Sequence, residues 1–256
     1  MNIVVCIKAV SRQFDSLRIS DEGMGLAFEG RSWVMNESDE YALEQALLIK
    51  KKQPAAITAL TVGPITSQEV LYRALAKGAD AAIRIEGDEF DPNITGLKLA
   101  CALRKVTYDL ILTGVESFDG MASQVSLSMA AQLSLPFAYA VTKIAEVSSC
   151  AIIIDRELGG GRKQTLEITM PALLAVQPNN DPLSYAPAAK LVQVRRRPLP
   201  CWSLTDLGLA EVDVMAKRKM KWIRIEPRKP SGEIQWFSGD AANIADAILS
   251  KVRDSL

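Results

Sequence analysis

The chain contains no histidine and only four cysteines among its 256 residues. The cysteines (Cys6, Cys101, Cys150 and Cys201) lie far apart in the sequence and form no CxxC pair, so we expect neither a zinc site nor a disulfide framework. The absence of histidine removes the commonest general base and every Ser-His or Cys-His nucleophile pair. We therefore predict no catalytic residue of the usual hydrolase kind and no metal ligand.

Other features that are missing narrow the class further. No apolar run approaches the roughly 18 residues of a membrane span. The first residues, 1–8, are apolar but lack the basic region and cleavage site of a signal, so they predict a strand. Thirty acidic residues balance thirty basic ones, which gives no reason to expect nucleic-acid binding. These observations favour a cytoplasmic globular protein with no membrane span.

Strand and helix patterns alternate through the first half of the chain. Residues 36–50 form a helix with Asn36 as N-cap, residues 66–77 a helix opened by a Thr66–Glu69 capping box, and residues 91–104 a helix entered through Asp91. Continuous apolar strands between helices indicate a parallel sheet covered on both faces. The predicted strands are 2–8, 33–35, 56–62, 81–85 and 110–113, and a further helix covers 121–133.

The pattern changes after residue 140. Strands at 141–146, 151–155 and 165–170, separated by turns at 148–149 and 159–161, predict an antiparallel hairpin elaboration of the same domain. After Pro178 the chain is rich in proline and carries the basic run Arg195–Arg197, which we interpret as a solvated or subunit-facing patch rather than an RNA site. We therefore divide the chain into an α/β domain, 1–185, and an extended C-terminal arm, 186–256, ending in a helix at 240–252.

Three tryptophans, Trp202, Trp222 and Trp236, stand in this arm without clear periodicity. Large apolar side chains in an irregular segment favour an arm that packs on a second polypeptide. The alternative is an arm that folds back on its own domain.

The most informative segment is 109–125, an apolar strand followed by a Gly/Ser-rich turn and an apolar helix. Such a turn presents unpaired N–H groups and the positive end of a helix dipole, which bind phosphate. An ordinary strand-to-helix turn is the alternative, and neither GxGxxG nor GxxxxGK[ST] is present. Loops that end parallel strands converge at one edge of the sheet. The predicted nucleotide-binding residues are Ala9, Asn36, Val62, Gly63, Gly114, Asp119, Gly120, Met121, Ala122, Ser123, Gln124 and Val125.

An ordered set of short motifs resembles the beta subunit of electron-transfer flavoproteins. The set comprises VVCIKAV near the start, Met35-Asn36 ahead of ALEQA, LTVGP ending at Pro64, RALAKGAD ending at Asp80, the segment 119–125, Arg156-Glu157 before a glycine cluster, and Met170-Pro171-Ala172. The resemblance implies a Rossmann-like domain of the adenine-nucleotide alpha-hydrolase type. It also implies a heterodimer with an FAD-carrying alpha subunit that moves electrons between a dehydrogenase and an acceptor.

The same resemblance implies one of two ligands in this subunit. Members that are simple electron carriers hold AMP and tend to have Asn-Gln-Thr at 123–125, whereas bifurcating members hold a second FAD that takes hydride from NADH. Residues 119–125 follow the flavin-binding pattern Asp-Gly-x-Thr-Ala-Gln-Val at four positions, which favours FAD, although Ser126 stands where a glycine is usual. A stand-alone AMP- or ATP-binding module without redox function is the alternative.

The resemblance also implies a docking region for a flavin dehydrogenase of the acyl-CoA dehydrogenase kind. Glu157 would help to set the domain arrangement there, or it is an ordinary surface carboxylate. The family's anchor leucine is missing from residues 177–185, so Leu183 would serve only in a shifted loop.

Overall fold

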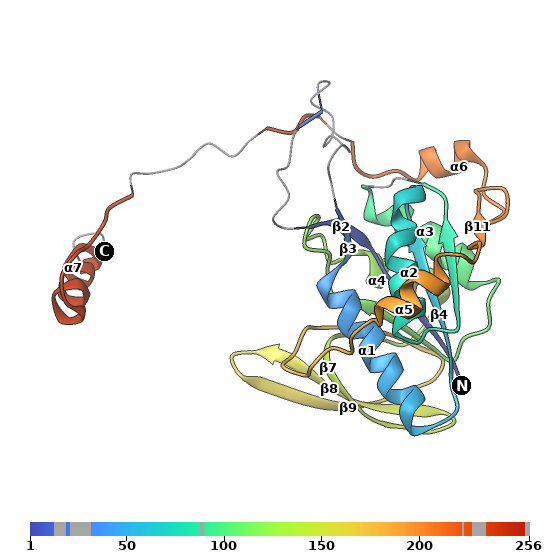
Figure 1. The fold of residues 1–256 in the computed structure, drawn as a ribbon, viewed down its shortest axis with the longest axis horizontal. Coiled ribbons are helices and arrows are strands. Elements are labelled where there is room, and N and C mark those ends of the chain that lie inside the picture. The colour runs from blue at the N-terminus through green and yellow to red at the C-terminus, as the bar shows by residue number, and fades with distance from the viewer. Residues whose placement is uncertain (13–18, 21–31, 88–89, 222, 227–233, 254–256) are drawn as a thin grey trace.

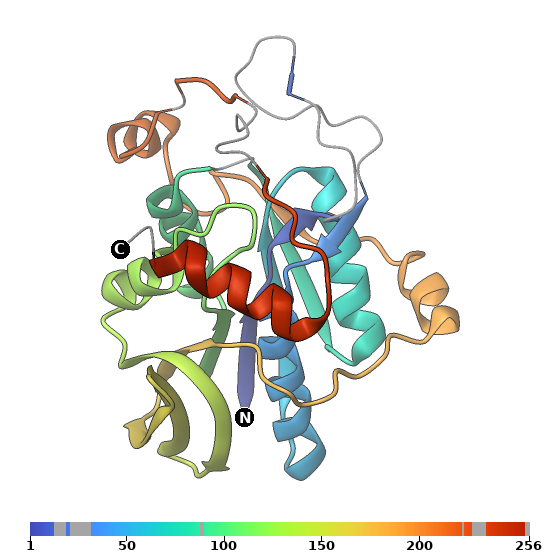
Figure 2. The ribbon, with the colours of Figure 1, turned by 90° about the vertical axis from the view of Figure 1, so that its left-hand side faces the viewer.

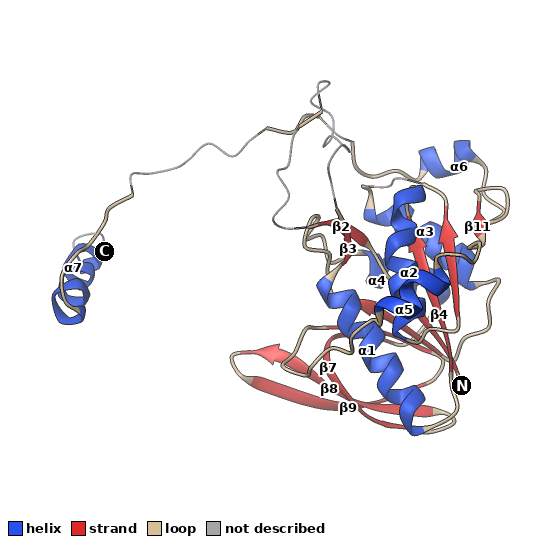
Figure 3. Ribbon diagram, in the orientation of Figure 1, coloured by secondary structure: helices blue, strands red, loops and turns tan. Residues whose placement is uncertain are grey.

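The described part of the chain folds around one nine-stranded sheet (Figures 1 and 3). This computed structural model describes residues 1–12, 19–20, 32–87, 90–221, 223–226 and 234–253. The strand order is β11-β5-β4-β1-β6-β10-β7-β8-β9; β11 to β7 run parallel, and β8 and β9 run antiparallel to their neighbours. The predicted α/β class, a parallel sheet with an antiparallel hairpin, is confirmed. The strands are β1 (Asn2–Cys6), β4 (Ala56–Val62), β5 (Ala81–Ile85), β6 (Leu110–Gly114), β7 (Phe137–Val147), β8 (Ala151–Gly159), β9 (Arg162–Thr169), β10 (Ala172–Val176) and β11 (Cys201–Trp202).

Helices cover both faces of the sheet because its central strands are apolar on both sides. Ile3 and Val5 of β1 belong to the core cluster under α1 (Glu37–Lys52) and α2 (Gln68–Lys77), while Val4 and Cys6 belong to the cluster under α3 (Pro92–Leu103) and α4 (Val125–Leu133). Alternate residues of one strand therefore enter different cores. The three layers are those that the alternating sequence pattern predicted.

Three local features differ from the sequence predictions. Strand β10 is not among the predicted strands, although all five of its residues are buried. Its short apolar run, ALLAV, follows directly on the hairpin, so the sequence pattern does not separate it as a strand of its own. Helix α4 begins at Val125 rather than at residue 121, because Met121 and Ser123 have positive φ values of 45° and 53°. The Thr66–Glu69 capping box does not form: a 3₁₀ turn, η1 (Ile65–Ser67), precedes α2, and the Ser67 hydroxyl donates to the carbonyl of Pro64.

The first part of the predicted arm lies against the α/β domain. Helix α5 (Ala188–Val194) packs on α2, and β11 adds to the edge of the sheet beside β5 (Figure 1). Trp202 is half-buried against the core on the α3 side, and Val214 of α6 (Glu211–Ala216) is also buried. Trp222 lies outside the described residues. The first part of the arm therefore folds back on its own domain, which is the alternative that the sequence left open.

The last helix, α7 (Ala241–Arg253), matches the helix predicted at 240–252. It stands clear of the α/β body in Figure 1 and lies in front of it in Figure 2, and none of its described side chains is buried. Trp236, just before it, is 86% exposed. No described helix combines the length and the apolar character that crossing a bilayer requires.

A buried carboxylate, Asp91, fixes the point at which the chain leaves the domain. One of its oxygens caps α3 by accepting from the N–H of Asn93 (2.9 Å), and the other accepts from the N–H groups of Lys219 and Met220 (2.6 and 2.9 Å). Burial raises the pKa of Asp91, but these donors outweigh it, and the pKa lies below its usual value. Arg218 adds a cation–π contact, 5.3 Å from the ring centroid of Phe90.

We predict that Asp91→Ala releases the segment around Lys219 while the sheet stays folded. The substitution removes the α3 cap and both bonds to the arm, and loss of a cap costs about 1 kcal/mol. Amide hydrogen exchange should become faster at residues 217–221 and stay unchanged in β1 and β6. Asp206→Ala, which removes a surface turn carboxylate bonded to Ser203, is the matched control and should leave residues 217–221 protected. Unchanged exchange in the Asp91 variant would contradict the assignment.

Candidate nucleotide-binding site

Asn36, Gly114 and the predicted residues 119–125 lie where the strand order reverses, whereas Val62 and Gly63 lie at the end of β4. The chain passes from β1 to β4 and β5 on one side and then returns to β6 on the other side of β1. The carboxyl ends of β1 and β6 therefore flank the switch point, which is where open α/β sheets bind ligands. Lys8 follows β1, and the loop after Gly114 follows β6.

Asn36 connects the end of β1 with the loop after β6. The sequence predicted it as the N-cap of α1, and it holds that position, but its side chain makes no cap hydrogen bond. Instead its amide nitrogen donates to the carbonyl of Glu116 (2.8 Å), and its amide oxygen accepts from the N–H of Phe118 (3.0 Å). Its own N–H donates to the carbonyl of Lys8 (3.0 Å). Asn36 therefore positions the loop after β6.

Asp39 is the residue that sequence reasoning missed. Its carboxylate is buried and accepts from the N–H of Lys8 (2.8 Å) and from the N–H of Gly114 (2.8 Å), so it ties α1 to the ends of β1 and β6. Burial raises its pKa to about 6, although the two N–H donors oppose the rise. Burial, and then the charge of Asp39, also raise the pKa of the Cys6 thiol. In the sequence, Asp39 is indistinguishable from an ordinary acid in the first turn of a helix.

Two predicted glycines provide space for helices. A Cβ at Gly114 would lie 2.5 Å from the Asp39 carboxylate and 2.6 Å from the Cβ of Ser38, so α1 approaches β6 closely only because position 114 is a glycine. A Cβ at Gly63 would lie 2.8 Å from Ser67. The N–H of Gly63 donates to Ile85 and its carbonyl accepts from Arg84, so its backbone has no group left over for a ligand.

The other two predicted residues outside the loop after β6, Ala9 and Val62, lie on strands β2 (Ala9–Ser11) and β4. Ala9 is in β2, which pairs with β3 (Trp33–Met35) in a separate two-stranded sheet. Its side chain is half-buried against the core. Val62 ends β4, packed against the core under α3. Their contact with a nucleotide stays a prediction.

The loop between β6 and α4 presents a row of unpaired donors, which we call the cradle (Gly114–Leu127). Within the described residues, the N–H groups from Ala122 to Leu127 make no hydrogen bond, and the first bonded amide of α4 is that of Ser128. Positive φ values at Met121 and Ser123 turn the backbone before the helix. The hydroxyl of Ser126 is buried and has no partner. Free amides at a helix N-terminus are groups that can bind an anion.

One cation lies in this cradle. The Lys8 ammonium donates to the Ser117 hydroxyl (3.1 Å) and to the Asp119 carboxylate (2.6 Å), with both side chains about 40% exposed. An exposed ion pair of this kind contributes about 0–1 kcal/mol, so it does not fix Lys8 against an incoming phosphate. The Ser123 hydroxyl donates to Glu116 (3.0 Å), while Gly120, Met121, Ala122 and Gln124 are exposed.

The two predicted docking residues lie away from the cradle, Glu157 in β8 and Leu183 in the loop between β10 and α5. Glu157 of β8 accepts from Gln177 (2.9 Å), and Ser184 beside Leu183 donates to the buried Glu44 of α1 through its N–H and hydroxyl. Leu183 itself is half-buried, whereas Tyr185 is 82% exposed. These contacts give Glu157 a structural partner and leave its docking role a prediction.

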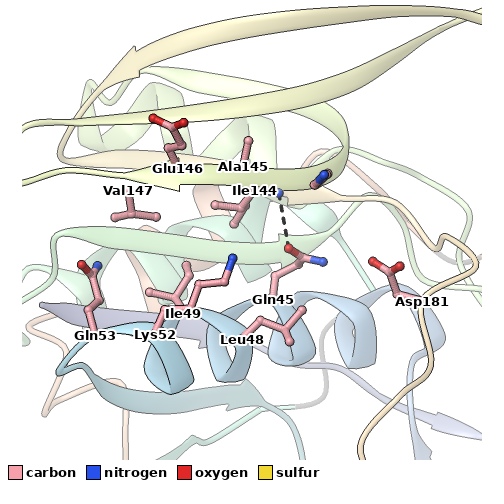
Figure 4. A pocket seen from close by; sticks show the side chains of 11 residues that line it. Gln45, Leu48, Ile49, Lys52, Gln53, Ile144, Ala145, Glu146, Val147 and Asp181 are labelled. Carbon is pink, nitrogen blue, oxygen red and sulfur yellow. Dashed lines mark hydrogen bonds between the residues drawn. The ribbon is translucent and has the colours of Figure 1, made fainter.

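A pocket of about 400 Å³ lies elsewhere, between the second half of α1 and β7 (Figure 4). Gln45 accepts from the N–H of Ile144 across it, and Lys52 and Glu146 line it. It brings together none of the predicted nucleotide-binding residues.

We predict that Asp39 makes the folded state less stable as the pH rises. Its pKa is about 6 in the folded chain and 3.8 for an ordinary aspartate, so the folded state binds more protons than the unfolded state between these pH values. The stability that protonated Asp39 gives the folded state is fully present below pH 3.8 and is lost as the pH rises through 6. The difference in unfolding free energy between the wild type and Asp39→Asn should fall by about 3 kcal/mol over this range. Urea unfolding between pH 4 and 7 measures it. A difference that does not change with pH would contradict the assignment.

Comparison with known proteins gives one consistent result. Residues 24–200 match the family model described as "Electron transfer flavoprotein domain". The chain is 31% identical to the electron transfer flavoprotein subunit beta of Bacillus subtilis, over 99% of this chain and 98% of that protein. It is 29% identical to the subunit of the same name from Methylophilus methylotrophus, over 99% and 98%. It is also 30% identical to the caffeyl-CoA reductase-Etf complex subunit CarD of Acetobacterium woodii, again over 99% and 98%.

These matches extend over the whole α/β domain and agree with the motifs and the mostly parallel sheet. The chain belongs to the electron transfer flavoprotein family, among its beta subunits.

Proposed function

We propose that this chain binds a nucleotide in the cradle and works as one half of a heterodimeric electron carrier. The observation that carries the proposal is the run of free N–H groups from Ala122 to Leu127 at the start of α4, together with the unpaired hydroxyl of Ser126. Six amides without partners are costly to leave unsatisfied unless a ligand or water pairs with them. A phosphate or diphosphate has the charge and the oxygens to do so.

The nucleotide that we propose for this cradle is FAD, with AMP as the alternative. The residues present suit a diphosphate: the amides of the cradle and Ser126 would hold its oxygens, and Lys8 would exchange Asp119 for a phosphate. FAD accepts and releases electrons. With this FAD as the second one of the complex, the proposal includes electron bifurcation, in which NADH is the electron donor. This chain's own part is to bind and orient the cofactor, with Asn36 and Asp39 holding the loop in place.

Family membership and the exposed end of the arm indicate which partners to propose. We propose an alpha subunit that carries the other FAD and that receives the end of the arm, where Trp236 and three apolar side chains of α7 (Ile248, Leu249 and Val252) are exposed. An exposed apolar helix face favours burial against another chain. The relative named as part of a caffeyl-CoA reductase complex supports a partner that acts on CoA thioesters, such as an acyl-CoA dehydrogenase.

The proposal is tested by the nucleotides that the purified complex releases. We expect the chain to co-purify with a second flavoprotein subunit and to release two FAD and no AMP per complex when it is denatured and its nucleotides are quantified by chromatography. One FAD with one AMP would keep the electron carrier and replace FAD by AMP in this subunit. No second subunit and no flavin would overturn the proposal in favour of a stand-alone nucleotide module.

We also predict that Ser126→Ala weakens nucleotide binding. Its hydroxyl has no partner in the described structure, and a hydrogen bond to a charged group contributes about 1.5–3 kcal/mol, so affinity should fall roughly tenfold or more. Ser128→Ala, two residues later on the same helix, is the matched control: its hydroxyl accepts from Gln132, and nucleotide affinity should stay unchanged. Equal affinities of the two variants for the nucleotide would remove Ser126 from the site.

A further inference from the structure

A second group of unpaired donors lies away from the cradle, at the carboxyl ends of β4 and β5. Thr61 of β4 and Arg84 of β5 are register partners, and both point to the α2 side of the sheet, opposite to Leu60 and Ile85. The exposed fraction is 1% for Thr61 and 7% for Arg84. Strands in a sheet are about 4.8 Å apart. Three spacings separate β5 from β6 and two separate β4 from β6, so Arg84 is about 14 Å and Thr61 about 10 Å from the strand that leads into the cradle.

The Arg84 guanidinium is buried without an opposite charge. Its Nη1 donates to the carbonyl of Gly63 (2.9 Å), while Nε and Nη2 make no hydrogen bond in the described part of the chain. No described carboxylate forms an ion pair with it. Burying an isolated charge costs several kcal/mol, so such a cation normally has a partner.

The neighbourhood adds positive charge and a further donor. Ser67 packs against Gly63 directly before α2, so the positive end of the α2 dipole faces the same place. The buried Thr61 hydroxyl has no partner. The acid in the first turn of α2, Glu69, is bound by Arg195 (2.7 Å to each oxygen) and by Arg73 (3.3 Å), so its charge is already balanced.

We propose that Arg84 and Thr61 form a second anion site, which takes a tetrahedral oxyanion: inorganic phosphate or the phosphate group of a small ester. The free edge of the guanidinium, Nε with Nη2, is the pair of parallel donors that binds two oxygens of one phosphate. The Thr61 hydroxyl is a third donor, and the Gly63 carbonyl holds the opposite side of the guanidinium in place. The site is independent of the nucleotide in the cradle, and an occupied site would make the stability of this edge depend on phosphate.

The test uses the complex as it purifies, with its nucleotide retained, transferred into phosphate-free chloride buffer. Calorimetric titration with inorganic phosphate should show one site in the wild type, at least roughly tenfold weaker in Arg84→Met and weakened in Thr61→Val. Arg104→Met, which removes an exposed arginine at the end of α3, is the control and should keep the affinity of the wild type. Glycerol 3-phosphate, titrated in the same way, decides the source: binding of both ligands indicates an ester site, and binding of phosphate alone indicates an ion site.

Two further measurements complete the test: the stability of the variants and the position of the bound anion. Arg84→Met should be at least as stable as the wild type without phosphate, because an apolar side chain replaces an unbalanced buried charge, and it should lose the stabilisation that phosphate gives the wild type. Crystals grown with selenate should show an anomalous peak at the guanidinium of the wild type and none in the variant. Equal phosphate affinity in wild type and Arg84→Met, or no phosphate binding by the wild type, would overturn the proposal. Ser126→Ala separates the two sites, because it should weaken the nucleotide and leave phosphate binding intact.

Discussion

The bridge that Asp39 makes between the amides of Lys8 and Gly114 is the contact on which the functional edge depends. One carboxylate joins the N-terminus of α1 to the ends of two neighbouring parallel strands, at the place where the strand order reverses. Gly114 makes the bridge possible because any side chain there would occupy the space of the carboxylate. A buried polar contact thus fixes the ends of β1 and β6 relative to α1. Its stability cost is visible in the raised pKa of Asp39.

The cradle depends on that bridge and on backbone conformation more than on side-chain chemistry. Asn36, three residues before Asp39 in the chain, holds the loop at Glu116 and Phe118. Left-handed residues at Met121 and Ser123 then delay the start of α4 to Val125, which leaves a longer row of free amides than a helix from residue 121 would. A family that moves electrons needs no acid or base at such a site, because the cofactor carries the chemistry and the protein supplies its position.

Two buried polar side chains, Asp91 and Arg84, also organise the sheet edge beyond the cradle. Asp91 is fully satisfied and fixes where the arm leaves the domain, whereas Arg84 is buried with most of its donors free. A satisfied buried carboxylate stabilises one arrangement of the chain, and an unsatisfied buried cation favours binding of an anion. The same physical rule therefore assigns a structural role to one residue and a ligand to the other.

The sequence by itself determined the fold class, the family and most elements, because apolar periodicity and turn residues act locally: α1, α3, β5 and the hairpin β8–β9 lie where their patterns indicate. It also predicted a nucleotide-binding turn in the segment after β6, with Asn36 and Gly114 among its residues, and the structure places Asn36 and Gly114 beside that loop. It missed β10, whose position between β6 and β7 is a matter of long-range pairing, and it gave Asn36 a capping role that its contacts with Glu116 and Phe118 replace. Only the tertiary structure decided that Asp39 bridges two strands and that Arg84 is buried without a counter-charge, because burial and partners across the sheet depend on residues far away in the chain.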